Sequence, residues 1–362
     1  MAEPASSRAM KALVFSASKN ALSLETEYPK PSCINRNSSE NNGSTDGQQA
    51  IVQVSRAAIC NTDLEITKGY VLNYENVLGH EFVGRVVESD DLALIGKRVV
   101  AEINCPCEPC PSGLCPEGQN PMVFARNHTP RRTVLGIINM DGCMAQYCKV
   151  PSNNLHIVPD DVSDQEAAFT EPLAAAYRIV EQEIIARSHR VGVVGDGKLG
   201  LLIAHVLSTT GHHVTFFGRH KRKLNLVEGV ADRIIVDDTT SGAYAGKFDV
   251  VIEASGSPAG ILLTAALTKP MGTIVLKSTC STESDGEMPT WSAIANDIVV
   301  NEKRLLGSRC GPIGPALELL RDPGTKRLVN SMVDAVYSID DGIEAFEKAR
   351  QKGSLKVQIF FD

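Results

Sequence analysis

Three side chains that can bind a metal ion stand far apart in this sequence. They are Cys60 in Cys60-Asn61-Thr62-Asp63, His80 in Gly79-His80-Glu81, and Glu171 in Glu171-Pro172-Leu173-Ala174. A catalytic zinc takes three protein ligands of these kinds and leaves a fourth position open. Zinc held in this way lowers the pKa of a bound alcohol and polarises a bound carbonyl. The three residues therefore predict a catalytic zinc site for an alcohol or carbonyl substrate.

Each of these residues also has a simpler explanation. Cys60 alone fits a small buried apolar residue, and His80 alone fits a hydrogen-bonded core histidine. Their joint occurrence with Thr62, Asp63 and Glu171 favours the metal site. For Glu81 two roles stay open: a carboxylate that supports the ligands, or a fourth ligand that exchanges with water as substrate arrives.

A glycine-rich segment lies directly after an apolar strand pattern at 191–194 and directly before a helical pattern at 198–209. It is Gly195-Asp196-Gly197-Lys198-Leu199-Gly200. In such a segment the first glycine permits a tight turn, the second lets the backbone approach a pyrophosphate, and the third lets the helix pack on the strand. The helix N-terminus then faces the phosphates. The context predicts a dinucleotide-binding turn.

The end of the next predicted strand bears on the choice of cofactor. A NAD site usually has a carboxylate there to bind the ribose hydroxyls, whereas a cation suits the 2′-phosphate of NADP. This chain has Gly218 and Arg219 followed by a basic run, so NADP(H) is favoured over NAD(H). Ser255-Gly256 follows a later strand on the same edge of the sheet, where backbone approaches the nicotinamide ribose.

Four of the ten cysteines fall close together, at Cys105, Cys107, Cys110 and Cys115. In a reducing compartment such crowding favours metal binding over disulfides. Four thiolates can enclose a tetrahedral structural zinc. A lobe without metal and a redox-sensitive thiol cluster stay open as alternatives.

The rest of the chain shows a change of pattern near Ser163. Before it, strand signals dominate; from Ser163, a helix cap with Glu166 three residues later opens a helical pattern that continues to about residue 180. Strands and helices then alternate, which predicts a parallel sheet with helices on both faces. The expected strands are 12–15, 50–54, 82–87, 98–103, 191–194, 214–217, 233–236, 248–252 and 272–276, and the expected helices after 180 are 198–209, 221–227 and 258–267.

Composition limits the remaining function classes. With 362 residues, 43% of them hydrophobic and 22% charged, the chain is long enough for two globular domains. A net charge of −7 gives no reason to expect nucleic acid or an anionic membrane as a partner. No apolar run reaches the length of a membrane helix, and the start lacks a secretory pattern. The expected compartment is the cytoplasm.

With these motifs in hand, the chain resembles the zinc-dependent medium-chain dehydrogenases/reductases, the alcohol dehydrogenase superfamily. Glutamate at position 171 is similar to the sorbitol and threonine dehydrogenase-like branch. The resemblance implies an α/β fold: a GroES-like, mainly β catalytic domain with an inserted Rossmann domain, a doubly wound parallel sheet. The implied boundaries are 1–175 for the first part of the catalytic domain, with a cysteine-rich lobe at about 104–118, then 176–305 for the Rossmann domain and 306–362 for the catalytic return.

The resemblance also implies roles for single residues. Thr62 is similar to the proton-relay hydroxyl of the family, Asp63 to the acid that orients the histidine ligand, and Lys356 to a basic residue near the cofactor pyrophosphate. Where the relay often continues to a histidine, this chain has Glu65, so the relay beyond Thr62 stays open. The family forms homodimers through the edges of its Rossmann sheets, and also homotetramers.

The cysteine spacing departs from the usual pattern of the family. The family's four cysteines usually follow C-x2-C-x2-C-x7-C, and here only Cys107 and Cys110 keep the spacing. The function implied is hydride transfer between NADP(H) and an alcohol, polyol, aldehyde or ketone. A zinc-free quinone or enone reductase of the same superfamily and a catalytically inactive dinucleotide-binding protein remain as alternatives.

Overall fold

The computed structural model describes residues 9–33, 48–106, 127–129, 131–279 and 291–362. The chain divides into two compact units. Unit 1 comprises Met1–Glu171 and Ile313–Asp362, and unit 2 comprises Pro172–Pro312. Both ends of the chain thus belong to one unit, and the middle forms the other.

Unit 1 is built mainly from antiparallel strands in three sheets. The largest has the order β10-β6-β5-β3-β18-β17, with β9 also paired to β3; β2-β1-β4 form a second sheet and β7-β8 a third. The strands are β1 (Ala9–Ser16), β2 (Ala21–Pro29), β3 (Gln49–Ala58), β4 (Glu75–Val77), β5 (Glu81–Ser89), β6 (Arg98–Ala101), β7 (Asn104–Cys105), β8 (Thr133–Val134), β9 (Tyr147–Pro151), β10 (Leu155–Ile157), β17 (Val333–Ser338) and β18 (Lys356–Phe360).

The strand β3 shows why the large sheet forms. Its apolar side chains Ile51, Val52 and Val54 are fully buried, while Gln53 faces solvent. It pairs with β5 and β9 from the first part of the chain and, through Ala57, with Ile359 of β18 from the last part. The pairing of β3 with β18 joins segments about 300 residues apart, so the carboxyl end of the chain completes this sheet.

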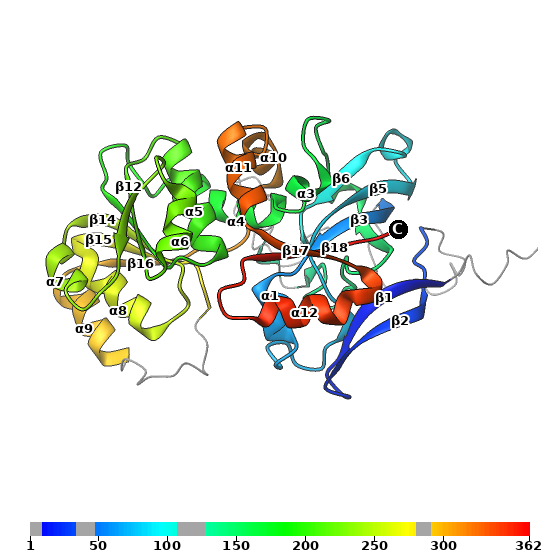
Figure 1. Cartoon of the computed structure of the whole chain (residues 1–362), viewed down its shortest axis with the longest axis horizontal. Helices are drawn as coiled ribbons and strands as arrows, with labels where there is room; N and C mark the ends of the chain where they lie inside the picture. The colour runs from blue at the N-terminus through cyan, green and yellow to red at the C-terminus, as the bar shows by residue number, and fades with distance from the viewer. Residues whose placement is uncertain (1–8, 34–47, 107–126, 130, 280–290) are drawn as a thin grey trace, which may run out of the picture. The chain divides into compact units, whose positions relative to one another are not determined.

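Short helices and turns cover unit 1. Figure 1 shows α12 beside the amino-terminal strands β1 and β2, and a side chain on Gly342 of this helix would collide with Leu13 of β1. The helical segments are α1 (Asn61–Ile66), η2 (Leu92–Leu94), η3 (Ser152–Asn154), α3 (Asp164–Ala167), α10 (Ile313–Leu319), α11 (Pro323–Ser331), η5 (Ile339–Asp341) and α12 (Gly342–Arg350).

Unit 2 contains a six-stranded sheet with the order β13-β12-β11-β14-β15-β16, and all its strands are parallel. In Figure 1, α5 and α6 lie toward one side of this sheet and α7 and α8 toward the other. This is the doubly wound Rossmann arrangement that the alternating pattern predicts. Its elements are β11 (Val191–Val194), α5 (Lys198–Thr209), β12 (Val214–Gly218), α6 (Lys221–Leu224), η4 (Asn225–Val227), β13 (Asp232–Ile235), α7 (Thr240–Tyr244), β14 (Phe248–Glu253), α8 (Pro258–Leu267), β15 (Thr268–Leu276), α9 (Trp291–Val300) and β16 (Arg304–Gly307).

The helical pattern after Ser163 corresponds to two helices instead of one. The predicted cap is present, since the Ser163 hydroxyl accepts from the Glu166 amide and the Glu166 carboxylate accepts from the Ser163 amide. However, α3 ends at Ala167, and α4 (Thr170–Glu181) begins after two intervening residues. Phe169, fully buried, occupies the break. Because Phe169 is apolar and buried, the helical spacing of apolar residues continues across the turn. Periodicity alone therefore predicts one continuous helix.

Among the described residues, no helix has both the length and the apolar character that crossing a bilayer requires.

Candidate metal and dinucleotide sites

Three potential metal ligands converge in unit 1. The sulfur of Cys60, a ring nitrogen of His80 and a carboxylate oxygen of Glu81 all lie within 4.8 Å of one another. Cys60 is the N-cap residue of α1, and Glu81 is the first residue of β5. Gly79 turns the chain into that strand with a φ of +96°, a conformation that glycine adopts readily. The local backbone thus places a thiol, an imidazole and a carboxylate together.

Asp63 holds two members of this group. Its side chain is fully buried; one carboxylate oxygen accepts from the Cys60 amide at 2.8 Å, and the other accepts from the Gly79 amide at 3.2 Å. The latter oxygen also lies 3.4 Å from Nδ1 of His80. Burial lowers the pKa of His80, but the charges of Asp63 and Cys60 outweigh it and hold that pKa well above the ordinary value. With Nδ1 facing Asp63, Nε2 is the ring nitrogen left for a metal.

The Glu81 carboxylate also has a partner outside this group. Its Oε2 lies 2.6 Å from Nζ of Lys356, and both side chains are buried. Nζ of Lys356 also lies 5.7 Å above the ring of Phe169. Burial lowers the pKa of Lys356, but the charge of Glu81 and smaller effects of Cys60 and Glu171 raise it overall. Lys356 therefore stays charged beside the metal-ligand group.

The other predicted site residues of unit 1 lie around this group. The Cys60 thiol points to Oγ1 of Thr62 at 3.7 Å. Glu171, at the start of α4, is outside the 4.8 Å cluster. Its charge nevertheless helps to raise the pKa of Lys356. Glu65 forms an ion pair of 3.0 Å with Lys68, and both side chains are exposed.

These donors fit a catalytic zinc. A thiolate, an imidazole and a carboxylate are the ligand types that zinc takes, and at catalytic sites one position stays open. Asp63 supplies the acid that usually orients a histidine ligand and fixes its tautomer.

In unit 2 the glycine-rich turn has the shape that a dinucleotide needs. Gly195 has a φ of +113°, and a Cβ there would meet the backbone of Ser255 at 2.6 Å. A Cβ on Gly200 would meet the Gly195 carbonyl at 1.8 Å, so the helix α5 packs directly on the turn. Gly197 is the N-cap of α5 and has nothing within 4 Å of its Cβ position. The helix N-terminus is therefore open to an anion, as phosphate binding requires.

Two carboxylates shape the neighbouring turns of unit 2. Glu253, at the end of β14, accepts from the amides of Ser255 and Gly256 and from the Ser255 hydroxyl. Asp196, in the glycine-rich turn, accepts from the amides of Arg219 and His220 after β12. Both carboxylates lie at the carboxyl edge of the parallel sheet, where such folds bind cofactors.

Comparison with known proteins identifies the family of the chain. Residues 46–160 match the model of the alcohol dehydrogenase GroES-like domain, and residues 165–361, more than half of the chain, match that of the glucose dehydrogenase C-terminus. An erythritol/L-threitol dehydrogenase of Mycolicibacterium smegmatis is 31% identical over 297 residues, 73% of this chain and 77% of the relative. The chain belongs to the zinc-type alcohol dehydrogenase family.

Other proteins similar to this chain are also dehydrogenases. An L-threonine 3-dehydrogenase of Xanthomonas euvesicatoria is 29% identical, over 58% of this chain and 64% of that protein. A solved structure from Sinorhizobium meliloti, described as a zinc-binding dehydrogenase bound to NADP, has 26% identity and a TM-score of 0.77, covering 97% of this chain and 99% of that one. The dehydrogenase is thus an oxidoreductase that acts on CH–OH groups of small molecules, with zinc and a nicotinamide cofactor.

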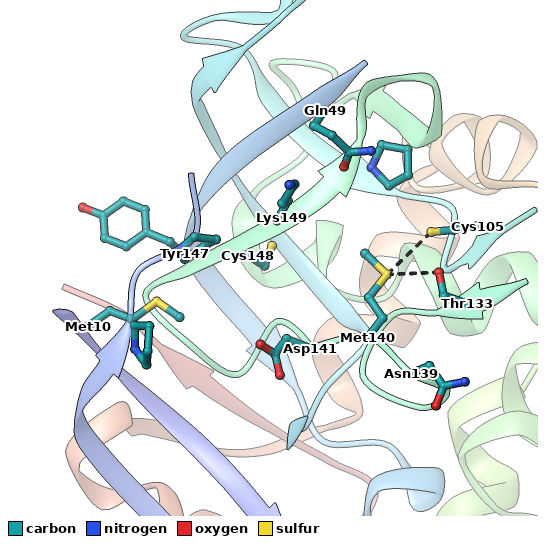
Figure 2. Close-up of a pocket in the computed structure, with 14 residues that line it drawn as sticks. Met10, Gln49, Cys105, Thr133, Asn139, Met140, Asp141, Tyr147, Cys148 and Lys149 are labelled. Carbon is teal, nitrogen blue, oxygen red and sulfur yellow. Dashed lines mark hydrogen bonds between the residues drawn. The ribbon is translucent and has the colours of Figure 1, made fainter. Parts of the chain in front are cut away.

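The cysteine lobe of this dehydrogenase is described only at its first member. Cys107, Cys110 and Cys115 lie outside the described residues, so the predicted second zinc stays a prediction. Cys105 is buried, which raises the pKa of its thiol to about 11. Its sulfur lies 3.8 Å from Sδ of Met140, which the Thr133 hydroxyl also approaches at 3.7 Å. Figure 2 shows these three side chains together at one side of a pocket of about 440 Å³ in unit 1.

Two residues near the sites have partners that sequence reasoning missed. The resemblance assigns Lys356 to the cofactor pyrophosphate, but in the structure the ammonium is buried against Glu81, so a role at the cofactor stays a prediction. Asp196 stands at a variable position of the glycine-rich motif, so the motif itself does not predict its bonds to the next turn. An acid at that position together with a glycine at 218 is the one hint, because a Cβ on Gly218 would meet Asp196 at 2.6 Å.

Proposed function

We propose that this dehydrogenase exchanges a hydride between NADP(H) and a polyol or its keto form, at a zinc held by Cys60, His80 and a carboxylate. The observation that carries the proposal is the convergence of the Cys60, His80 and Glu81 ligand atoms within 4.8 Å. The polyol class rests on relatives named for erythritol and threitol, and for D-arabitol phosphate in Enterococcus avium. Zinc at this site supplies a Lewis acid that lowers the pKa of the substrate hydroxyl.

The residues of the chain divide the remaining work. Glu171 is proposed as the third ligand, and Glu81 as a carboxylate that either supports the group or exchanges into it. Lys356 holds the Glu81 carboxylate in place, since its Nζ lies 2.6 Å away. Asp63 orients the His80 ring through its contact with Nδ1. Thr62, 3.7 Å from the Cys60 sulfur, is proposed to accept the proton of the substrate hydroxyl.

The zinc content of two variants distinguishes the roles of Glu171 and Glu81. If Glu171 is the third ligand, Glu171→Gln lowers the zinc bound per chain more than Glu81→Gln does. The reverse order assigns the third position to Glu81.

The choice of NADP over NAD is supported by the residues after β12. No carboxylate directly follows Gly218 there; the exposed Arg219 does. A guanidinium pairs well with a phosphate. Replacing Arg219 with alanine is expected to raise the KM for NADPH about tenfold or more and to leave the KM for NADH nearly unchanged, with Lys221→Ala as the control. Equal effects on both cofactors would remove this support.

The oxidoreductase proposal is tested by turnover. Zinc-loaded protein is assayed for NADP⁺ and NAD⁺ reduction with tetritols, pentitols and hexitols, and for NADPH oxidation with the corresponding ketoses and simple aldehydes. Polyol-dependent NADP⁺ reduction supports the proposal. Activity with quinones or enones alone, without zinc dependence, would support the zinc-free reductase instead.

We also propose a homo-oligomer formed through unit 2. The strand β16 is the last strand in the order of the sheet. Near it, Met271, Val299 and Val300 are 72%, 75% and 79% exposed. An edge strand with apolar neighbours favours pairing with a second copy.

A further inference from the structure

The glycine-rich turn and the turn after β12 are joined by one carboxylate. Oδ2 of Asp196 accepts from the amide of Arg219 at 2.7 Å and from the amide of His220 at 2.6 Å. The residue Asp196 is 8% exposed. A side chain at 218 would collide with this carboxylate, since its Cβ would lie 2.8 Å from Oδ2, so glycine at this position makes the contact possible.

The imidazole of His220 faces the same carboxylate. Its Nδ1 lies 3.0 Å from Oδ2 and 3.1 Å from Oδ1 of Asp196. Burial raises the pKa of Asp196, but the hydrogen bonds from His220 and Arg219 outweigh it and hold that pKa below its ordinary value. Asp196 is therefore a carboxylate at neutral pH, and Nδ1 of His220 must carry the proton of this contact. The ring is 48% exposed, which leaves Nε2 available to a ligand at the surface.

The contact between Asp196 and His220 affects how a phosphate on the adenosine ribose could bind. In a Rossmann fold the ribose 2′ position lies beside the end of the second strand, which is β12 here. The first two amides after β12 already donate to Asp196. These two amides are therefore not available to a 2′-phosphate, which would lie next to a carboxylate that repels it. The His220 side chain contacts this carboxylate and is 48% exposed.

We propose that His220 determines whether this dehydrogenase accepts the 2′-phosphate of NADP(H), by donating its Nδ1–H to the Asp196 carboxylate and so offsetting the negative charge that would repel the phosphate. Without His220, the Asp196 oxygens that it now contacts would face the ligand, repel a phosphate and suit the ribose hydroxyls of NAD(H), which carboxylates bind at this place in related folds. Asp196 is the positioning residue of the pair. The inference rests on the proposed function only in needing a nicotinamide dinucleotide at this turn.

The test compares two fragments that differ only in the 2′-phosphate. Isothermal titration gives the Kd of 2′,5′-ADP and of 5′-AMP for the full-length protein and for His220→Ala, Asp196→Asn and the double variant. His220→Ala is expected to weaken 2′,5′-ADP binding about 10- to 100-fold and to leave 5′-AMP binding nearly unchanged. In the Asp196→Asn background, the same His220 change is expected to have a much smaller effect. Lys221→Ala is the control for a general loss of positive charge.

Several outcomes would overturn the inference. They are equal weakening of both fragments by His220→Ala, an undiminished effect of His220→Ala in the Asp196→Asn background, or no tighter binding of 2′,5′-ADP than of 5′-AMP by the unaltered protein. His220→Gln, which keeps a donor without a charge, is measured in parallel so that a poorly folded alanine variant still leaves a decisive comparison. Fragment binding needs neither zinc nor turnover, so a failure of the proposed polyol activity leaves this result standing.

Discussion

Lys356 and Glu81, 275 positions apart in the chain, form an ion pair of 2.6 Å in which both side chains are at most 2% exposed. Glu81 is also one of the three clustered metal-ligand candidates. The carboxyl-terminal strand β18 therefore fixes a residue of the metal site that the amino-terminal half provides.

Breaking this ion pair is expected to be costly. Lys356→Met leaves the Glu81 carboxylate buried without its partner and is expected to lower the free energy of unfolding by about 3–5 kcal/mol. Urea unfolding of zinc-free protein measures the effect. The control is Lys11→Met, which removes a pair of the same 2.6 Å length at the surface and is expected to cost about 0–1 kcal/mol. Similar costs for the two variants would show that the buried pair contributes no more than an exposed one.

The glycine-rich turn allows a matched comparison of two glycines. Gly200→Ala drives a Cβ into the Gly195 carbonyl, and overpacking of this kind is expected to lower the free energy of unfolding by about 1–3 kcal/mol. Gly197→Ala meets nothing within 4 Å and is expected to change stability by less than about 0.5 kcal/mol. Its methyl group nevertheless occupies the space that a pyrophosphate approaches, so it is expected to weaken NADPH binding. Tight NADPH binding by Gly197→Ala would place the phosphates elsewhere.

The fold was largely predictable because its signals are local. The bounds of β11, α5 and α8 agree with the expected ranges, since periodicity, a glycine turn and a proline at a helix start act over a few residues. The break at Phe169 was not predictable, because a buried ring at a bend keeps the apolar spacing. Nor were the Lys356–Glu81 and Asp196–His220 contacts, because each joins residues that only the tertiary fold brings together.

The buried carboxyl of Glu253 makes stability depend on pH. Burial raises its pKa above the ordinary 4.5, against the hydrogen bonds from Ser255 and Gly256, and its Oε2 has no hydrogen-bond partner within the described part of the chain. The stabilisation that the neutral Glu253 carboxyl provides is complete below pH 4.5. It is lost as the pH rises through the raised pKa of this group. The melting temperature of the unaltered protein is therefore expected to fall relative to that of Glu253→Gln as the pH increases from 4.5.

Glu166 provides a control of opposite sign for the same titration. Burial raises its pKa, but hydrogen bonds from Ser163 and Asn330 outweigh it and lower that pKa below 4.5. The stabilisation that the ionised Glu166 carboxylate provides is present above pH 4.5. It is lost as the pH falls through the lowered pKa of this group. The advantage of the unaltered protein over Glu166→Gln is thus expected to shrink on acidification. For each variant, the measured quantity is the melting temperature of the unaltered protein minus that of the variant. If this difference changed with pH in the same direction for Glu253→Gln as for Glu166→Gln, the assignment would be contradicted.

The proposed oligomer is tested at the edge of the unit 2 sheet. Val300→Lys places a charge on the exposed apolar surface near β16 and is expected to shift the mass measured by light scattering from a dimer or tetramer toward a smaller species. The control is Leu72→Lys, since Leu72 is 86% exposed but belongs to unit 1. An unchanged mass for Val300→Lys, or a monomeric unaltered protein, would rule out this interface.

The central claim is that Cys60 helps to hold a catalytic zinc. Its most direct test is the zinc content per chain, measured by mass spectrometry together with NADP⁺ reduction, for the unaltered protein and Cys60→Ser. Cys33→Ser, at a cysteine outside the metal-ligand group, is the control. We expect Cys60→Ser to lose one zinc per chain and its turnover, while Cys33→Ser keeps both. Full zinc content and full turnover in Cys60→Ser would contradict the claim.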